Sequence, residues 1–105
     1  YKGNLDICPV EVTMQIVGGK YTLLIIRELL TGKKRFGEIK KQVPGISTKT
    51  LTERLAFLKE QGLISRKAYK TIPLKVEYSL TENGLSLQPL IDQMREWGKI
   101  QLGIN

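Results

Sequence analysis

An α+β fold that is mainly helical, with one two-stranded β-hairpin, is predicted by three observations in this sequence of 105 residues. Apolar residues recur at helical spacing in several segments, and Leu51, Leu55 and Leu58 are the clearest example. Residues 64–70 and 75–80 instead alternate with period two around a turn that contains Pro73. The hydrophobic content of 41% suffices for one core at this length. We therefore expect a single domain over residues 1–105.

Two helices are predicted in the first part of the chain. Pro9 suits the first position of a helix, and the Gly18-Gly19 pair ends that helix. Residues 20–30 are apolar on nearly all sides, and Gly32 stops this segment. A helix without a polar face is buried centrally, so this segment is expected in the middle of the core.

A short third helix and a tight turn lead into a fourth helix whose outer face is polar. Pro44 and Gly45 close the third helix and lead directly to Ser47, a good N-cap residue. Gly62 stands where a helix ends in a left-handed residue. Two helices joined in this way, the second polar on its outer face, form the helix-turn-helix arrangement. The apolar residues of the third helix are Phe36, Ile39 and Val43.

A basic β-hairpin and a last helical segment follow. The hairpin comes directly after the polar helix and would stand beside it as a wing, so the predicted architecture is a winged helix-turn-helix. Thr81 can cap the last segment, which runs to about Leu102. Pro89 lies inside this segment. Either the helix bends there, or a short turn precedes a new helix that starts near Pro89.

An apolar band in the last segment has two interpretations. It could pack on the chain's own core, or it could be left over after the core has formed and then need a partner. We favour a homodimer interface, because the other apolar residues already fill a core of this size. The terminal segments 1–19 and 82–105 are therefore predicted to dimerise. The band consists of Leu90, Ile91, Met94 and Trp97.

Positive charge is concentrated in the middle of the chain. The net charge is +7, yet residues 33–75 alone carry +9 and the remainder carries −2. Such a balance favours a polyanionic partner. The alternative is the ordinary solvated surface of a basic protein. Since the charge coincides with the polar helix and the hairpin, a DNA-reading segment is placed at about residues 33–80.

Composition also disfavours several classes of protein. The chain has no histidine, the commonest general base and metal ligand, and one cysteine cannot form a thiolate metal cluster. We expect no enzymatic activity, no metal and no cofactor. A single cysteine fits a reducing compartment, and no apolar run approaches the roughly 18 residues of a membrane span. Because no signal-peptide pattern follows Tyr1 either, we expect a cytoplasmic protein.

The first half of the fourth helix holds the candidates for reading bases. Lysine suits guanine O6 and N7, glutamate can accept from cytosine N4, and a threonine methyl can touch a thymine methyl. The base-reading candidates are Thr48, Lys49, Thr52 and Glu53. Arg54, at the edge of the leucine stripe, either reaches a phosphate or forms an ion pair on the helix surface. Ser47 belongs to the same predicted DNA-binding set.

Lysines and arginines outside this helix are predicted to contact the DNA backbone. Those before and on the third helix are Lys33, Lys34, Arg35, Lys40 and Lys41. The wing adds Lys70 and Lys75 beside its tip, directed at a flanking phosphate or at the minor groove.

Several motifs together resemble the HxlR family of bacterial transcriptional regulators, which have a winged helix-turn-helix related to that of the MarR group. The match runs from about Cys8 to Gly98. Its motifs are Cys8-Pro9-Val10-Glu11, residues 18–25, Arg35-Phe36, residues 44–47, Leu51-Thr52, Arg54-Leu55, Gly62-Leu63 and residues 76–81. The resemblance implies a homodimer that binds double-stranded DNA near promoters. Tyr21 departs from the pattern, because the family usually has tryptophan there.

Cys8 has a structural and a functional interpretation. Free cysteines are often small buried apolar residues without chemistry. Cys8 however directly precedes Pro9, and a thiol at a helix N-terminus meets the positive end of the helix dipole, which favours the reactive thiolate. The resemblance adds that several family members respond to electrophiles or oxidants through a cysteine at this position. Cys8 is therefore the candidate sensor.

These observations predict a sequence-specific regulator of transcription that binds double-stranded DNA. We expect a homodimeric repressor on an inverted-repeat operator, responsive to an oxidant or electrophile through Cys8. The alternative is a winged-helix module that binds proteins and has no specific DNA target. The charge on the helix and wing argues against that alternative, because such a module needs no charge directed at a polyanion.

Overall fold

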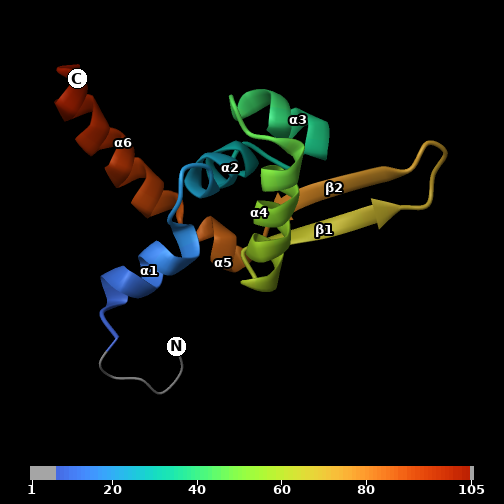
Figure 1. The fold of residues 1–105 in the computed structure, drawn as a ribbon, viewed down its shortest axis with the longest axis horizontal. Coiled ribbons are helices and arrows are strands. Elements are labelled where there is room, and N and C mark those ends of the chain that lie inside the picture. The colour runs from blue at the N-terminus through green and yellow to red at the C-terminus, as the bar shows by residue number, and fades with distance from the viewer. Residues whose placement is uncertain (1–6, 105) are drawn as a thin grey trace.

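A computed structural model describes residues 7–104, and their fold is mainly helical with one β-hairpin (Figure 1). This confirms the predicted fold class. Residues 1–6 and 105, which belong to the predicted dimerisation segments, lie outside the described residues. The elements are α1 (Pro9–Val17), α2 (Thr22–Leu29), α3 (Phe36–Gln42), α4 (Thr48–Glu60), β1 (Ile64–Tyr69), β2 (Lys75–Leu80), α5 (Glu82–Leu85) and α6 (Gln88–Leu102).

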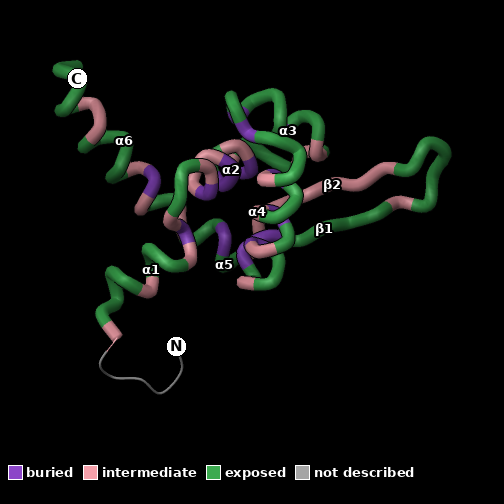
Figure 2. Tube along the Cα trace, in the orientation of Figure 1, coloured by how far each residue is buried: buried purple, intermediate pink, exposed green. Residues whose placement is uncertain are grey.

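The core lies where α2, α3 and α4 meet, and Figure 2 shows buried residues in α2 and α4. The stripe on α4 is buried as predicted, since Leu51 and Leu58 are 0% exposed and Leu55 is 2% exposed. Ile25 and Ile26 of α2 belong to the same cluster and are fully buried. The helix period therefore turns one face of α4 inward and leaves its polar residues outside.

One part of the α2 prediction is wrong. The helix begins at Thr22, and it is not buried all round, because Leu23 and Leu24 are only half-buried. Both line an open groove of about 260 Å³ between α2 and α6. Leu23 and Leu24 thus face the groove beside α6 and solvent, whereas the opposite side of α2 packs into the core.

The hairpin is antiparallel and is attached to the helical body at its base. The register sets Lys67 opposite Glu77. β1 ends one residue earlier than predicted, and residues 70–74 form the tip. Lys34 adds a bridge, because its N–H donates to the Tyr78 carbonyl at 2.9 Å and its carbonyl accepts from the Tyr78 N–H at 2.8 Å. These bonds fix the base of the wing to the segment between α2 and α3.

Two alternatives were open for Pro89, a bend in one helix or the start of a new helix. The structure has a new helix there. The Thr81 hydroxyl accepts from the Gly84 N–H at 3.1 Å and caps α5, which ends at Leu85. α6 then begins at Gln88, and Pro89 occupies its first turn, where a missing N–H costs nothing. Gly84 is required here, since any side chain would overlap the backbone of Leu63.

The terminal helices and the wing lie at opposite ends of the molecule (Figure 1). α1 and α6 extend to one side of the α2–α4 body, and the hairpin projects from the other side. Within residues 7–104, no helix has the length and apolar character needed to cross a membrane. The fold therefore places the terminal helices and the lysine-bearing wing at opposite ends.

Candidate nucleic-acid interface

The turn between α3 and α4 is held against α2. Gly45 has a φ of +83°, a conformation that L side chains rarely adopt, so glycine is required at this point of the turn. The Tyr21 hydroxyl donates to the Gly45 carbonyl at 3.2 Å. Tyr21 is the N-cap residue of α2. It anchors the turn that sets the entry angle of α4.

Ser47 caps α4 as predicted. Its hydroxyl oxygen accepts from the Thr50 N–H at 3.0 Å and lies 3.0 Å from the Thr50 hydroxyl oxygen. The Thr50 N–H and hydroxyl therefore both contact the Ser47 hydroxyl at the start of α4, although Ser47 is exposed. The hydroxyl's established role is to satisfy an N–H that would have no partner in the first turn. A contact from Ser47 to DNA stays a prediction.

The four base-reading candidates share the outer face of α4, and all four are exposed. The Lys49 ammonium lies 3.9 Å from the Glu53 carboxylate, one helical turn away. Both side chains are well exposed, so this pair is worth little and either member is free to exchange its partner for a base. The Thr52 hydroxyl donates to the Thr48 carbonyl at 2.8 Å. That bond engages the hydroxyl of Thr52 within the helix.

Arg54 lies apart from the other candidates. It is half-buried, and its guanidinium approaches the turn between α1 and α2, where a Cβ on Gly19 would be 3.9 Å from Nη2. Among residues 7–104 it forms no ion pair, so the alternative of a pair on the helix surface is not found. A phosphate contact from Arg54 stays a prediction.

The basic residues of α3 are exposed around the helix start and its outer side. Arg35 is the N-cap of α3, and its N–H donates to the Glu38 carboxylate at 2.8 Å. Lys40 and Lys41 lie in the last turn, and both are exposed. All three cations are therefore accessible to a phosphate near the helix-turn-helix.

An ion cluster along the wing was not predicted from the sequence. The Glu77 carboxylate, 12% exposed, lies 3.6 Å from Lys75 and 3.7 Å from Lys33. The ammonium groups of Lys67 and Lys75 each lie 4.9 Å from the centre of the Tyr69 ring. Lys75 is thus held by two partners, whereas Lys70 at the tip is exposed. The signal in the sequence was the single acidic residue of an otherwise basic hairpin, placed opposite Lys67 by the strand register.

The cluster lowers the pKa of Glu77. The largest cause is hydrogen bonding with the Tyr69 hydroxyl, and the charges of Lys33 and Lys75 act in the same direction, against partial desolvation. The same contact raises the pKa of Tyr69. Among the described residues, the Glu77 Oε1 atom has no hydrogen-bond partner, because Lys33 is slightly too distant. The carboxylate is therefore held by the Tyr69 hydroxyl and by the charges of Lys33 and Lys75, and it links the wing to the segment before α3.

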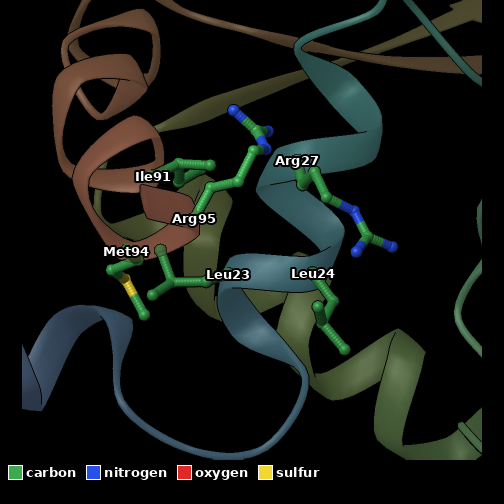
Figure 3. Close-up of a pocket in the computed structure, with 6 residues that line it drawn as sticks. All are labelled: Leu23, Leu24, Arg27, Ile91, Met94 and Arg95. Atoms are coloured by element: carbon green, nitrogen blue, oxygen red, sulfur yellow. The ribbon is translucent and has the colours of Figure 1, made fainter. Parts of the chain in front are cut away.

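The predicted interface residues on α6 fall into two groups. Ile91 is 7% exposed and belongs to the chain's own core, which differs from its predicted place in an interface. Leu90 is half-buried, Met94 is 50% exposed and Trp97 is 66% exposed. Figure 3 shows Leu23 of α2 and Met94 of α6 facing each other across the groove between these helices. The uncovered surface therefore begins beyond Ile91, toward the C-terminus.

α1 contributes apolar side chains that sequence reasoning did not single out. Val10 and Met14, one turn apart, are both exposed. They line a groove of about 430 Å³ that Leu90 and Met94 border from α6. The helical spacing of these α1 residues was the available signal. Whether they belong to a core or to an interface depends on packing that spacing does not reveal.

Cys8 is exposed at the start of α1. It is the N-cap residue, its carbonyl accepts from the Val12 N–H at 3.1 Å, and its side chain forms no capping bond. The interpretation of Cys8 as a buried apolar residue is therefore wrong for this chain. The thiol is open to reagents at the end of the molecule that carries the apolar surface of α1 and α6.

Glu77 makes the stability of the fold depend on pH in acid. Because folding lowers its pKa, its contribution is fully present above the pKa of the unfolded chain, near ~4.3, and is lost as pH falls through the folded value. Glu77→Gln should lower the melting temperature at neutral pH and approach the wild type once the pH is below the lowered pKa of folded Glu77. Thermal unfolding between these limits measures the effect. Glu60→Gln, at an exposed site on α4, is the matched control. An equal deficit for Glu77→Gln at both pH limits would contradict the assignment.

Comparison with known proteins identifies the family. A family model described as HxlR-like helix-turn-helix matches residues 16–104. YdeP of Bacillus subtilis, named as an uncharacterized HTH-type transcriptional regulator, is 48% identical over 92 residues, which are 88% of this chain and 72% of YdeP.

Two redox-related structures are also similar to the chain. The redox regulator HypR in its oxidized form has a TM-score of 0.83 and 43% identity, covering 88% of this chain and 95% of HypR. The reduced transcriptional regulator YodB from Bacillus subtilis has a TM-score of 0.78 and 38% identity, and the match covers 89% of this chain and 92% of YodB. The chain therefore belongs to the HxlR family of helix-turn-helix transcriptional regulators, which are not enzymes.

Proposed function

We propose that this regulator is a cytoplasmic repressor of transcription that binds a specific sequence of double-stranded DNA as a homodimer. The observation that carries the proposal is the outer face of α4. It is polar and exposed, and its helix is fixed from behind by a fully buried leucine stripe. Such a helix can enter a major groove without disturbing the core, and its first residues then meet the base edges.

The charges around this face support a division of tasks. Lys49, Thr52 and Glu53 on α4 offer a donor, a methyl and an acceptor, which is a set that distinguishes bases. Exposed cations on α3 and on the wing, such as Lys40 and Lys70, suit phosphates on either side. Base contacts then select the sequence, and phosphate contacts supply affinity and orientation.

The surface at the other end of the molecule supports the homodimer. α6 ends in a run of exposed apolar residues, and α1 adds Val10 and Met14, which line a groove with Leu90 and Met94 in the first half of α6. A second copy is the simplest cover for this surface, because a two-fold contact buries the same residues on both chains. Two α4 helices related by that axis would meet an inverted repeat with half-sites about one helical turn apart. The apolar residues near the end of α6 are Trp97, Ile100 and Leu102.

Cys8 supports regulation by an oxidant or electrophile. HypR is named a redox regulator, and YodB has been solved in diamide-treated and quinone-bound forms. Because Cys8 is the only cysteine, an internal disulfide cannot form. Oxidation would join Cys8 thiols of two chains, with two electrons and two protons passing to the oxidant, and an electrophile would form a thioether. Either product lies on the proposed dimer side and would change the separation of the two α4 helices.

DNA binding should depend steeply on salt. If a dimer neutralises about 6–10 phosphates, its affinity for a specific duplex falls by about 10³–10⁵ between roughly 50 and 200 mM salt.

Lys49→Ala should relax the preference at particular base pairs, at about 1–3 kcal/mol per contact. Lys70→Ala should weaken all sequences alike and reduce the salt slope by about 1. Gel shifts with competitor duplexes at several salt concentrations measure the base preference and the salt slope. A flat salt response would leave the protein-binding module as the better interpretation.

Trp97 should matter for assembly more than for folding. Its side chain is 66% exposed, so Trp97→Ala removes little from the fold of one chain. At the centre of an interface the same change costs about 2 kcal/mol or more, which is roughly a thirtyfold rise in the dissociation constant of the dimer. Sedimentation equilibrium measures this constant. Leu85→Ala, another exposed apolar residue but on α5, should leave it unchanged. A wild-type chain that sediments as a monomer at micromolar concentration would rule out the homodimer.

Treatment with diamide or an alkylating agent should alter DNA binding of the wild type through Cys8. Cys8→Ser should fold normally, bind the same duplex and be insensitive to both reagents, because the exposed thiol is the site of reaction. Non-reducing electrophoresis after diamide should show a covalent dimer that a reductant reverses. If the treated wild type retains unchanged DNA binding while its thiol is fully modified, Cys8 is not a sensor.

A further inference from the structure

The tip of the wing carries apolar side chains that have no role in packing. Ile72 is 102% exposed and Leu74 is 71% exposed, and they flank Pro73 at the far end of the hairpin. Figure 1 shows this end of the hairpin well separated from the helical body. Within residues 7–104, neither residue belongs to the core or to the residues packed against it. Their exposure is therefore not explained by the fold.

The tip nevertheless has a defined shape. The Thr71 hydroxyl donates to the Pro73 carbonyl at 2.8 Å, and the Thr71 N–H donates to the Tyr69 carbonyl at 2.9 Å. These two bonds tie the residues on either side of Ile72 to each other and to the strand. Ile72 is thus presented on a constrained loop, so that less conformational freedom is lost when it is covered.

The charges that surround the tip restrict what covers it. Lys67, Lys70 and Lys75 are the charged side chains nearest to it along the two strands, together with Glu77. The Glu77 carboxylate is only 12% exposed and is already paired with Lys33 and Lys75. The outward charge around the apolar pair is therefore positive. A partner must offer negative charge close to a surface that apolar side chains can enter.

The minor groove of duplex DNA has both properties. Phosphates line its edges, and apolar side chains inserted between its base steps unstack them and bend the duplex toward the major groove. The same hairpin stands beside α4, so a wing tip in an adjacent minor groove is compatible with α4 in the major groove. An acidic protein surface would satisfy the lysines but offers no general reason for aliphatic residues at the outermost point.

We propose that Ile72 and Leu74 form an apolar wedge that enters the minor groove beside the half-site, partly unstacks one base step and bends the DNA. This inference rests on the proposed DNA-binding function. It assigns these two residues a part in specificity that needs no hydrogen bond to a base. Pyrimidine–purine steps such as TA and CA unstack most easily, and A-tracts resist deformation. The wedge should therefore favour a flexible step at one fixed distance from the bases that α4 reads.

The experiment uses duplexes of about 30 bp that the wild-type chain selects from a randomised pool, labelled with a dye pair at their ends. Energy transfer between the dyes reports the bend, and titration reports the affinity. The wild type should bend the duplex and should bind about tenfold more tightly when the flanking step is TA than when it is within an A-tract. The Ile72→Ala/Leu74→Ala double variant should lose most of the bend and bind both duplexes within about twofold. Because both side chains are exposed, its melting temperature should match the wild type.

Two variants separate the wedge from simple charge. Lys70→Ala removes a neighbouring cation and should reduce affinity and the salt slope while leaving the bend and the step preference intact. Ile72→Met keeps an apolar side chain at the tip and should preserve both the bend and the preference. If the double variant bends DNA like the wild type, or keeps the tenfold preference, the wedge is wrong even though specific DNA binding stands. If the wild type binds no duplex in a salt-dependent manner, the proposed function itself fails, and the wedge with it.

Discussion

Burial of the leucine stripe on α4 is the constraint on which the rest of this structure depends. Leu51, Leu55 and Leu58 are all at most 2% exposed, and each contributes about 1.5–3 kcal/mol when it leaves water. A helix anchored by three such contacts on one side has no freedom to rotate. Rotation by one residue, about 100°, would bring polar residues such as Thr52 and Lys59 toward the core. The polar face that meets a partner is therefore fixed from the inside.

The wing obtains its place from a different kind of contact. The paired backbone bonds between Lys34 and Tyr78 determine where the hairpin leaves the body, and Glu77 adds an attraction between the wing and Lys33. These contacts involve the segment just before α3, so the wing and the helix-turn-helix share one support. The hairpin beyond them has no packing partner among the described residues. Its outer half is therefore available for an external surface, and its composition of lysine and aliphatic side chains reflects that position.

Much of the fold could be predicted because its signals are local. The Ser47 cap, the leucine period and Gly62 each act within a few residues, so the limits of α4 were close to those observed. The choice between a bent helix and a new helix at Pro89 was not local, because it depends on Gly84 fitting against the backbone of Leu63. The ion cluster around Glu77 likewise required the strand register, which no single segment determines.

The apolar residues of α6 show most clearly where sequence reasoning stops. Ile91 and Trp97 belong to one continuous band in the sequence, yet Ile91 packs in the core and Trp97 is exposed. The difference arises because α2 covers only the start of α6, where Leu23 meets Met94 (Figure 3). α2 thus contacts the core on one side and the base of α6 on the other. In the proposed dimer, a shift of the terminal helices would reach α4 through this one helix, and Tyr21 at its start holds the turn that leads into α4.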